Sequence, residues 1–158
     1  MLADLRADPS AAESPADVCI IGAGAAGISL ARALAAQGRS VCLLESGGLD
    51  FEQATQDFCR GSNVGMEYYP LDHARLRFFG GTTRIWGGRC ALLDPIDYAV
   101  RDWVPLSGWP IDDTVLDPWY RRAHEAFDLG EFDYGDDTWG SLDVPAPGFD
   151  PARITARL

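Results

Sequence analysis

The sequence contains no lysine, and this absence defines its charge. All thirteen basic residues are arginines, set against 24 acidic residues, so the formal net charge of the 158-residue chain is −11. A chain with this charge repels nucleic acid and anionic membrane surfaces at long range. We therefore expect no nucleic-acid partner and interpret the acidic residues as a solvated surface.

Long hydrophobic runs are also missing. No stretch approaches the roughly 18 consecutive apolar residues that a membrane-spanning helix needs. Residues 1–16 are rich in alanine, proline, serine and aspartate, and they lack the apolar segment of a secretory signal peptide. The sequence thus predicts a cytoplasmic protein without membrane contact, and a disordered leader over residues 1–16.

Cysteine and histidine are few and poorly spaced for metal or redox chemistry. The four cysteines follow no Cys-x-x-Cys spacing. Two of them, Cys19 and Cys42, lie in apolar runs, where a free thiol packs as a small hydrophobe. The two histidines, His73 and His124, form no His-Glu-x-x-His motif, and no Gly-x-Ser-x-Gly motif is present. We expect no metal site and assign no catalytic residue.

The best-defined secondary structure lies near the N-terminus. Residues 17–22 and 40–45 are short apolar runs typical of buried strands, and residues 25–37 have the alanine and leucine content and the spacing of a helix. Gly38 supplies the left-handed residue that commonly follows a helix. Strand, helix and strand in this order predict a βαβ unit with parallel strands, and hence a Rossmann-like α/β fold.

A Gly-x-Gly-x-x-Gly motif connects the first strand to the helix. The first glycine permits a tight turn, the second lets the backbone approach a pyrophosphate, and the third lets the helix pack against the strand. The helix N-terminus then offers free N–H groups and a partial positive charge to the phosphates. We assign the whole motif to the cofactor site: Gly22, Ala23, Gly24, Ala25, Ala26 and Gly27.

An acidic residue ends the second strand. Glu45 follows Gly27 by 18 residues, where a carboxylate accepts hydrogen bonds from a ribose 2′-hydroxyl and repels a 2′-phosphate. This position disfavours NADP. The motif itself does not distinguish NAD from FAD.

A second glycine cluster follows a loop-rich stretch. Residues 46–79 show little regularity apart from a short helix expected around residues 51–58. Two Gly-Gly pairs then occur seven residues apart. Glycine pairs of this kind indicate either a backbone that passes close to a flat or charged ligand, or a strained loop with a structural role only. The candidate ligand-binding residues here are Gly80, Gly81, Thr82, Thr83, Trp86, Gly87 and Gly88.

The C-terminal third contains one amphipathic helix. The spacing of Leu116, Trp119, Tyr120, Ala123 and Phe127 predicts a helix over residues 112–127 with these side chains on its packed face. Gly130 is expected to end it, so we extend the region to 112–129. We predict three regions: the leader 1–16, the N-terminal part of a cofactor-binding domain over 17–130, and an irregular tail over 131–158.

Five segments together resemble the N-terminal part of the glucose–methanol–choline (GMC) oxidoreductases, over about residues 17–130. They are Val18–Gly27, Glu45–Gly48, Phe79–Gly88, Leu93–Asp97 and Ser107–Ile111. The resemblance implies FAD as the cofactor and an alcohol or sugar as the substrate. It places Glu45, with Ser46 beside it, at the adenosine ribose. It places Gly80–Thr83 along the pyrophosphate and ribityl path, and Trp86–Gly88 near the isoalloxazine ring.

Two departures from the family pattern matter. Where some relatives carry a histidine that links the flavin covalently, this sequence has Ile85, so we expect non-covalent FAD. Family members are several hundred residues long, and their substrate domain and catalytic histidine lie towards the C-terminus. We therefore expect an incomplete FAD-binding domain that is inactive in isolation. The alternatives are a non-catalytic dinucleotide-binding module, one chain of a split flavoenzyme with a C-terminal partner chain, an NAD-dependent dehydrogenase, or an unstable truncated product.

Overall fold

The computed structural model describes residues 1–134, 148 and 150 of the chain. The chain divides into two compact units, residues 1–88 and residues 89–158. The first unit contains the predicted βαβ segment and both glycine clusters. The second contains the predicted amphipathic helix.

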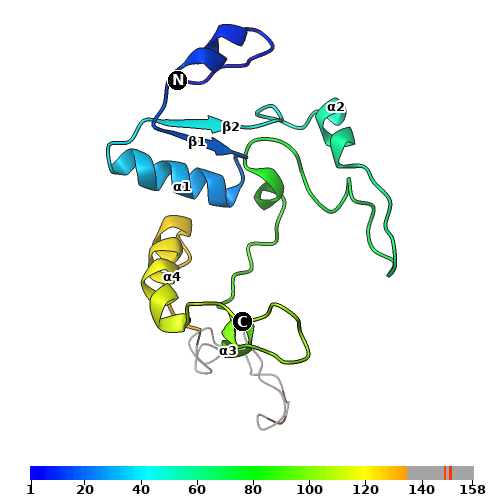
Figure 1. The fold of residues 1–158 in the computed structure, drawn as a ribbon, viewed down its shortest axis with the longest axis vertical. Coiled ribbons are helices and arrows are strands. Elements are labelled where there is room, and N and C mark those ends of the chain that lie inside the picture. The colour runs from blue at the N-terminus through cyan, green and yellow to red at the C-terminus, as the bar shows by residue number, and fades with distance from the viewer. Residues whose placement is uncertain (135–147, 149, 151–158) are drawn as a thin grey trace. The chain divides into compact units, whose positions relative to one another are not determined.

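A parallel strand pair and one helix form the centre of the first unit (Figure 1). Strand β1 spans Val18–Ile21, helix α1 spans Ala25–Ala36 and strand β2 spans Val41–Leu44. The strands pair in parallel, with Val18 opposite Val41 and Ile21 opposite Leu44. The predicted βαβ unit is confirmed, and each boundary lies within about one residue of the expected one. Gly38 follows α1 with a φ of +79°, as predicted.

Helix α1 covers one face of this strand pair. Ile20 is buried and points toward the helix, because its Cγ2 lies 3.5 Å from the position that a Cβ on Gly27 would occupy. Alternate residues of a strand point to opposite faces. On the other face Ile21 is 87% exposed, and Cys19 is exposed rather than packed as the sequence predicts. An apolar run predicts a strand buried on both faces, whereas only one face is covered here.

Loops and short helices occupy the rest of the first unit. Helix α2 (Gln53–Gln56) continues directly into a 3₁₀ helix, Asp57–Cys59, which confirms the short helix expected near residues 51–58. A second 3₁₀ helix, Gly81–Arg84, lies within the second glycine cluster. Gln56, Cys59 and Phe78 are buried.

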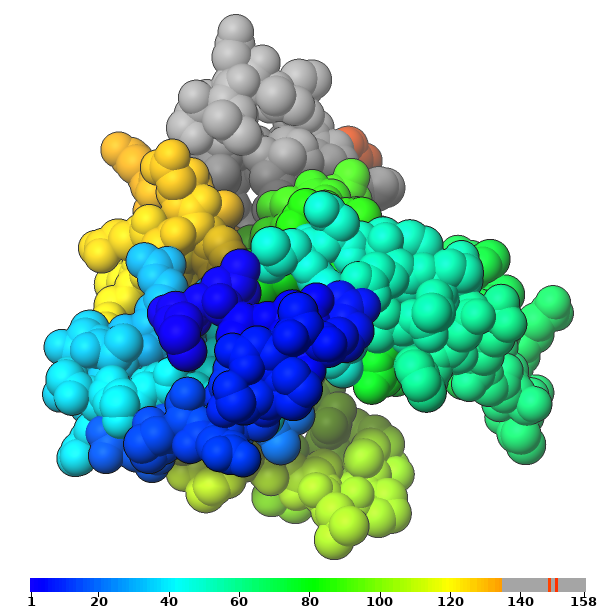
Figure 2. Space-filling model, turned by 90° about the horizontal axis from the view of Figure 1, so that it is seen from above, coloured from blue at the N-terminus to red at the C-terminus, as the bar shows by residue number. Residues whose placement is uncertain are grey.

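The leader carries more local structure than its composition suggests. Residues Pro9–Glu13 form a 3₁₀ helix, and the Asp8 side chain caps it by accepting a hydrogen bond from the Ser10 amide. Arg6 forms ion pairs with Asp4 at 2.9 Å and with Glu52 at 2.8 Å. Figure 2 shows the dark-blue leader beside the cyan segment that contains Glu52. The disorder that the sequence predicts for residues 1–16 concerns their motion, and it stays a prediction.

The second unit contains helices α3 (Pro95–Tyr98) and α4 (Asp113–Phe127). Asp112 caps α4 by accepting a hydrogen bond from the Val115 amide at 3.2 Å. The predicted helix over residues 112–127 is confirmed to within one residue. The residue that ends it is Asp128 rather than the expected Gly130, because Asp128 already adopts a left-handed conformation with a φ of +53°. Aspartate is one of the few non-glycine residues that reach this conformation at low cost.

The packed face of α4 differs from the predicted one. Trp119, Ala123 and Phe127 are exposed, whereas Leu116 and Tyr120 are half-buried and His124 is buried. The covered row therefore has a strict four-residue spacing, and a histidine takes the place expected for an apolar side chain. Most of the predicted tail, residues 135–147, 149 and 151–158, lies outside the described residues.

No helix in the described part of the chain is both long enough and apolar enough to cross a membrane.

Candidate functional site

The first glycine loop connects β1 to α1 and is shaped by close backbone contacts. A Cβ on Gly27 would lie only 2.0 Å from the carbonyl oxygen of Gly22, so the helix approaches the strand closely enough to exclude any side chain. Gly22 has a φ of +101°, which favours glycine, and its amide donates to the Leu44 carbonyl at 2.7 Å. These contacts agree with the structural roles predicted for the motif.

The loop leaves open space where a pyrophosphate would bind. A Cβ on Gly22 or Gly24 would have no atom of the described residues within 4 Å. Helix α1 begins at Ala25, and no side chain caps its N-terminus. Its first N–H groups and its partial positive charge therefore suit an anionic group. The residues present fit the diphosphate of a dinucleotide.

Glu45 follows β2 and binds the loops around it. One carboxylate oxygen accepts a hydrogen bond from the Ala23 amide at 2.8 Å. The other accepts from the Gly47 amide at 3.0 Å and from the Ser46 hydroxyl at 3.2 Å. The carboxylate therefore holds the first glycine loop against the turn after β2. This structural role is additional to the ribose contact that the sequence predicts.

These contacts determine the acidity of Glu45. Partial burial acts to raise its pKa, but the hydrogen bonds from Gly47, Ala23 and Ser46 together outweigh it, so the pKa lies below its ordinary value. The side chain is thus an anion at neutral pH, the form in which both of its oxygens only accept hydrogen bonds.

The second glycine cluster packs directly on the first. The Gly80 amide donates to the Ala23 carbonyl at 2.7 Å, and a Cβ on Gly81 would lie 3.6 Å from the Gly24 Cα. Gly80 begins the 3₁₀ helix Gly81–Arg84 in a left-handed conformation, with a φ of +89°. The Thr83 hydroxyl donates to the Gly80 carbonyl at 2.5 Å. The structure therefore brings together two clusters that are more than 50 residues apart in the sequence.

Ala23 is the point where these contacts meet. It is fully buried, with 0% exposure. Its N–H is bound by Glu45 and its carbonyl by Gly80. The sequence identifies Ala23 only as a small residue within the motif.

The remaining predicted residues lie just after this junction. Trp86, Gly87 and Gly88 follow the 3₁₀ helix and are exposed. A Cβ on Gly87 or Gly88 would have no protein atom within 4 Å. Their predicted place near the flavin ring stays a prediction.

Gly47 is a constrained residue that motif reasoning missed. A Cβ there would lie 2.2 Å from the Arg77 carbonyl oxygen, so the segment before the second cluster passes directly over it. The Phe79 amide also donates to the Gly48 carbonyl at 2.9 Å. The adjacent Gly47-Gly48 pair was the signal for this close approach.

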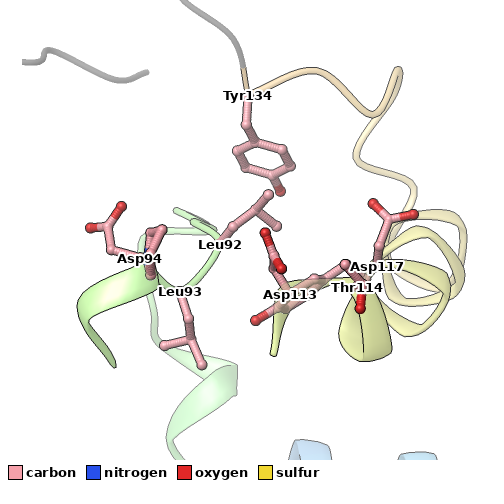
Figure 3. A pocket seen from close by; sticks show the side chains of 9 residues that line it. Leu92, Leu93, Asp94, Asp113, Thr114, Asp117 and Tyr134 are labelled. Atoms are coloured by element: carbon pink, nitrogen blue, oxygen red, sulfur yellow. The ribbon is translucent and has the colours of Figure 1, made fainter. Parts of the chain in front are cut away.

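A separate cavity lies within the second unit (Figure 3). Its volume is about 420 Å³, and the residues that line it include Asp94, Asp113, Asp117 and Tyr134. Asp94 caps α3, and Asp117 pairs with Arg121 at 2.9 Å, so two of the three carboxylates stabilise local structure. An acidic lining repels phosphate, and the cavity is therefore unsuited to a dinucleotide.

Neither histidine forms a recognisable catalytic group. The His124 ring is buried, and its Nδ1 lies 3.2 Å from the Gly130 carbonyl. The rings of Phe132 and Tyr134 pack edge-on against it. His73 is exposed in the turn after Pro70. Within the described residues, no group of three or more His, Cys, Asp or Glu side chains is placed to hold a metal ion.

The strand–loop–helix geometry, the free helix N-terminus and the acid after β2 define a dinucleotide-binding protein of the α/β class. Comparison with known families makes this assignment more specific. The model of the FAD dependent oxidoreductase family (DAO) matches residues 17–141. The match covers more than half of the chain, so the chain belongs to this family and its cofactor is FAD. No curated protein and no solved structure matches the chain.

Proposed function

We propose that this chain forms the FAD cradle of an oxidoreductase that acts on the CH–OH groups of alcohols or sugars. The main support for an FAD-binding role is the junction at Ala23, because it fixes the first glycine loop, Glu45 and Gly80 in one hydrogen-bonded arrangement. Family membership supports FAD over the NAD alternative. The alcohol or sugar substrate rests on the resemblance to the GMC oxidoreductases.

Different residues of the chain would bind different parts of FAD. The N–H groups of the first turn of α1, starting at Ala25, would hold the pyrophosphate, and Glu45 would accept from the ribose hydroxyls while keeping Ala23 in place. Residues 80–83 would line the path toward the flavin. FAD, when bound, accepts the hydride of the substrate, and the protein supplies binding and orientation.

The chain is proposed to need a base from elsewhere. Within the described residues, His124 is enclosed by aromatic rings and His73 is exposed in a turn. The Nδ1 of His124 is held by the Gly130 carbonyl and its ring is enclosed, so we do not assign the base to either histidine. A partner chain that supplies the base would make this protein one part of a split flavoenzyme. A non-catalytic FAD-binding module is the second candidate.

The cofactor assignment is tested by the visible absorption spectrum of the purified chain after incubation with FAD and removal of free dye. We expect a retained flavin band at about one FAD per chain. The Gly24→Val variant, whose new methyl groups would occupy the open space of the loop, should lose that band. Equal retention by the two proteins would contradict binding at this loop.

The non-covalent attachment is tested on the same material. Ile85, at the position where some relatives link the flavin, has no nucleophilic atom. Acid precipitation of the loaded protein should therefore release all of its flavin into the supernatant. Flavin that stays with the pellet after denaturation and washing would contradict this assignment.

The substrate class needs the protein together with any chains that accompany it in its own cells. We expect dye reduction by this native preparation with alcohols or sugars, and none by the isolated chain. Reduction with amines or amino acids alone would contradict the substrate class. Robust alcohol-dependent reduction by the isolated chain would contradict the need for a partner's base.

A further inference from the structure

Gln56 is a polar side chain that is buried although no motif includes it. It is the last residue of α2, and only 3% of its surface is exposed. Burying an amide is unfavourable unless its donors and acceptor find partners. The partners of Gln56 therefore indicate what the side chain does.

All three hydrogen bonds of this amide go to the backbone of one segment. Its Nε2 donates to the carbonyl of Asp72 at 2.6 Å and to that of Arg75 at 2.7 Å. Its Oε1 accepts from the Arg77 amide at 3.1 Å. One side chain thus uses both of its N–H groups and its oxygen to fix residues 72–77.

The fixed segment leads directly into the cofactor site. The Arg77 carbonyl passes over Gly47, and the Leu76 amide donates to the Thr82 hydroxyl at 3.0 Å. Two residues further on, Phe79 binds the Gly48 carbonyl, and Gly80 binds Ala23. The position of residues 72–77 therefore determines where the second glycine cluster meets the first.

We propose that Gln56 is a positioning residue for FAD binding. By holding residues 72–77, it places Gly80–Thr83 on the dinucleotide loop without touching the cofactor. This inference rests on the proposed cofactor role of those four residues. An amide is required because the site presents two carbonyl acceptors and one N–H donor, a pattern that a carboxylate or an apolar side chain cannot match.

Gln53 provides a matched control on the same helix. Its side chain is exposed, and its Nε2 donates to the Asp57 carboxylate at 2.7 Å, within the local helical segment. Substitution there changes the same chemical group one turn earlier and leaves residues 72–77 in place.

The experiment compares the full-length Gln56→Glu, Gln56→Met and Gln53→Glu variants with the wild type. FAD affinity is measured from the change in flavin fluorescence, and folding is checked by circular dichroism. At neutral pH the carboxylate of Gln56→Glu would repel two carbonyls, so we expect FAD binding at least about tenfold weaker. Gln53→Glu should bind FAD as the wild type does.

Acidification distinguishes positioning from simple destabilisation. When protonated, the new carboxyl group of Gln56→Glu regains one donor, so its FAD affinity relative to the wild type should recover as the pH falls. Gln56→Met, which cannot be protonated, should bind weakly at every pH. Wild-type affinity in a folded Gln56→Glu variant, or weak binding that acid does not restore, would overturn the proposal.

A second set of measurements needs no cofactor, and the first of them uses only the wild type. The structure predicts slow hydrogen exchange at the Arg77 amide of the wild type, and rapid exchange there would overturn the role of Gln56. Trypsin should also cut after Arg75 and Arg77 faster in Gln56→Glu than in Gln53→Glu. If the wild type shows these protections but binds no FAD, the proposed function fails while the action of Gln56 on the loop stands.

Discussion

Two glycines of the first loop differ in what surrounds them. Substitution of one should therefore affect mainly the stability of the fold, and substitution of the other mainly the binding of FAD. Gly27 has a carbonyl oxygen 2.0 Å from its Cβ position, whereas Gly24 has nothing within 4 Å and an ordinary φ of −81°. We expect Gly27→Ala to lower the free energy of unfolding by about 1–3 kcal/mol, because the helix must move off the strand. Gly24→Val should weaken FAD binding about tenfold or more, about 1.4 kcal/mol, with little change in stability.

Urea unfolding and flavin fluorescence on the same two variants measure these effects. Gly148→Ala, at a position where a Cβ would meet no atom of the described residues, controls for the added methyl group. A Gly24→Val variant that unfolds as easily as Gly27→Ala would show that the loop is packed rather than open.

Glu45 makes stability depend on pH. Its pKa is lowered in the folded state from the ordinary value of 4.5, so its contribution is present above about pH 4.5 and is lost as the pH falls through the folded-state pKa. The amide of Glu45→Gln can accept with only one atom. We expect this variant to be less stable at pH 7 by about 1 kcal/mol, a value reduced for solvent screening.

The pH profile of unfolding measures this effect. The stability difference between the wild type and Glu45→Gln should shrink below pH 4.5 and vanish once Glu45 is protonated in the folded wild type. Glu67→Gln, an exposed substitution, controls for the change in net charge. A difference that stays constant down to pH 3 would show that the anion of Glu45 is not what stabilises the loops.

At the scale of elements, the sequence predicts best where local signals act alone. The strands and α1 begin and end where the apolar runs and the glycines of the sequence predict. These boundaries are predictable because they depend on residues that are neighbours in the chain. The span of α4 was predicted to within one residue, but its capping residue and most of its packed face were not. His124 is buried because Gly130, Phe132 and Tyr134 fold back on it, which helical spacing does not encode.

The strand pair makes a prediction about thiol reactivity. Cys19 is exposed on the face of the sheet opposite α1, whereas Cys59 is buried at the end of its 3₁₀ helix. A disulfide reagent should modify Cys19 at least about tenfold faster than Cys59, which reacts only when the unit opens. Mass spectrometry of partly labelled chain measures both sites.

Cys19→Ser and Cys59→Ser variants confirm which thiol gives each kinetic phase. Slow labelling of Cys19 in the native chain would mean that something covers this face of the sheet. Equal rates at the two sites would mean that the segment around Cys59 is open.

At the scale of the molecule, the candidate cofactor site depends on contacts between distant segments. Motif spacing identified both glycine clusters, but it did not show that Gly80 binds Ala23 or that Gln56 fixes the approach to Gly80. A buried glutamine has no sequence signature, because its role depends on three backbone groups that come near only after folding. The two glycine clusters could therefore be predicted from the sequence, whereas their contacts with each other and with Gln56 could not.

The net charge makes a final prediction about FAD binding. A chain with a charge of −11 repels the FAD pyrophosphate at long range, although the N-terminus of α1 attracts it locally. Salt shortens the range of the repulsion from about 30 Å at 0.01 M to about 8 Å at 0.15 M, and so removes most of it. The affinity for FAD should therefore rise about twofold or more over this range, as measured by fluorescence titration. Riboflavin, which lacks phosphate, should show no such dependence. An FAD affinity that falls with salt would indicate that local attraction to the pyrophosphate outweighs the long-range repulsion.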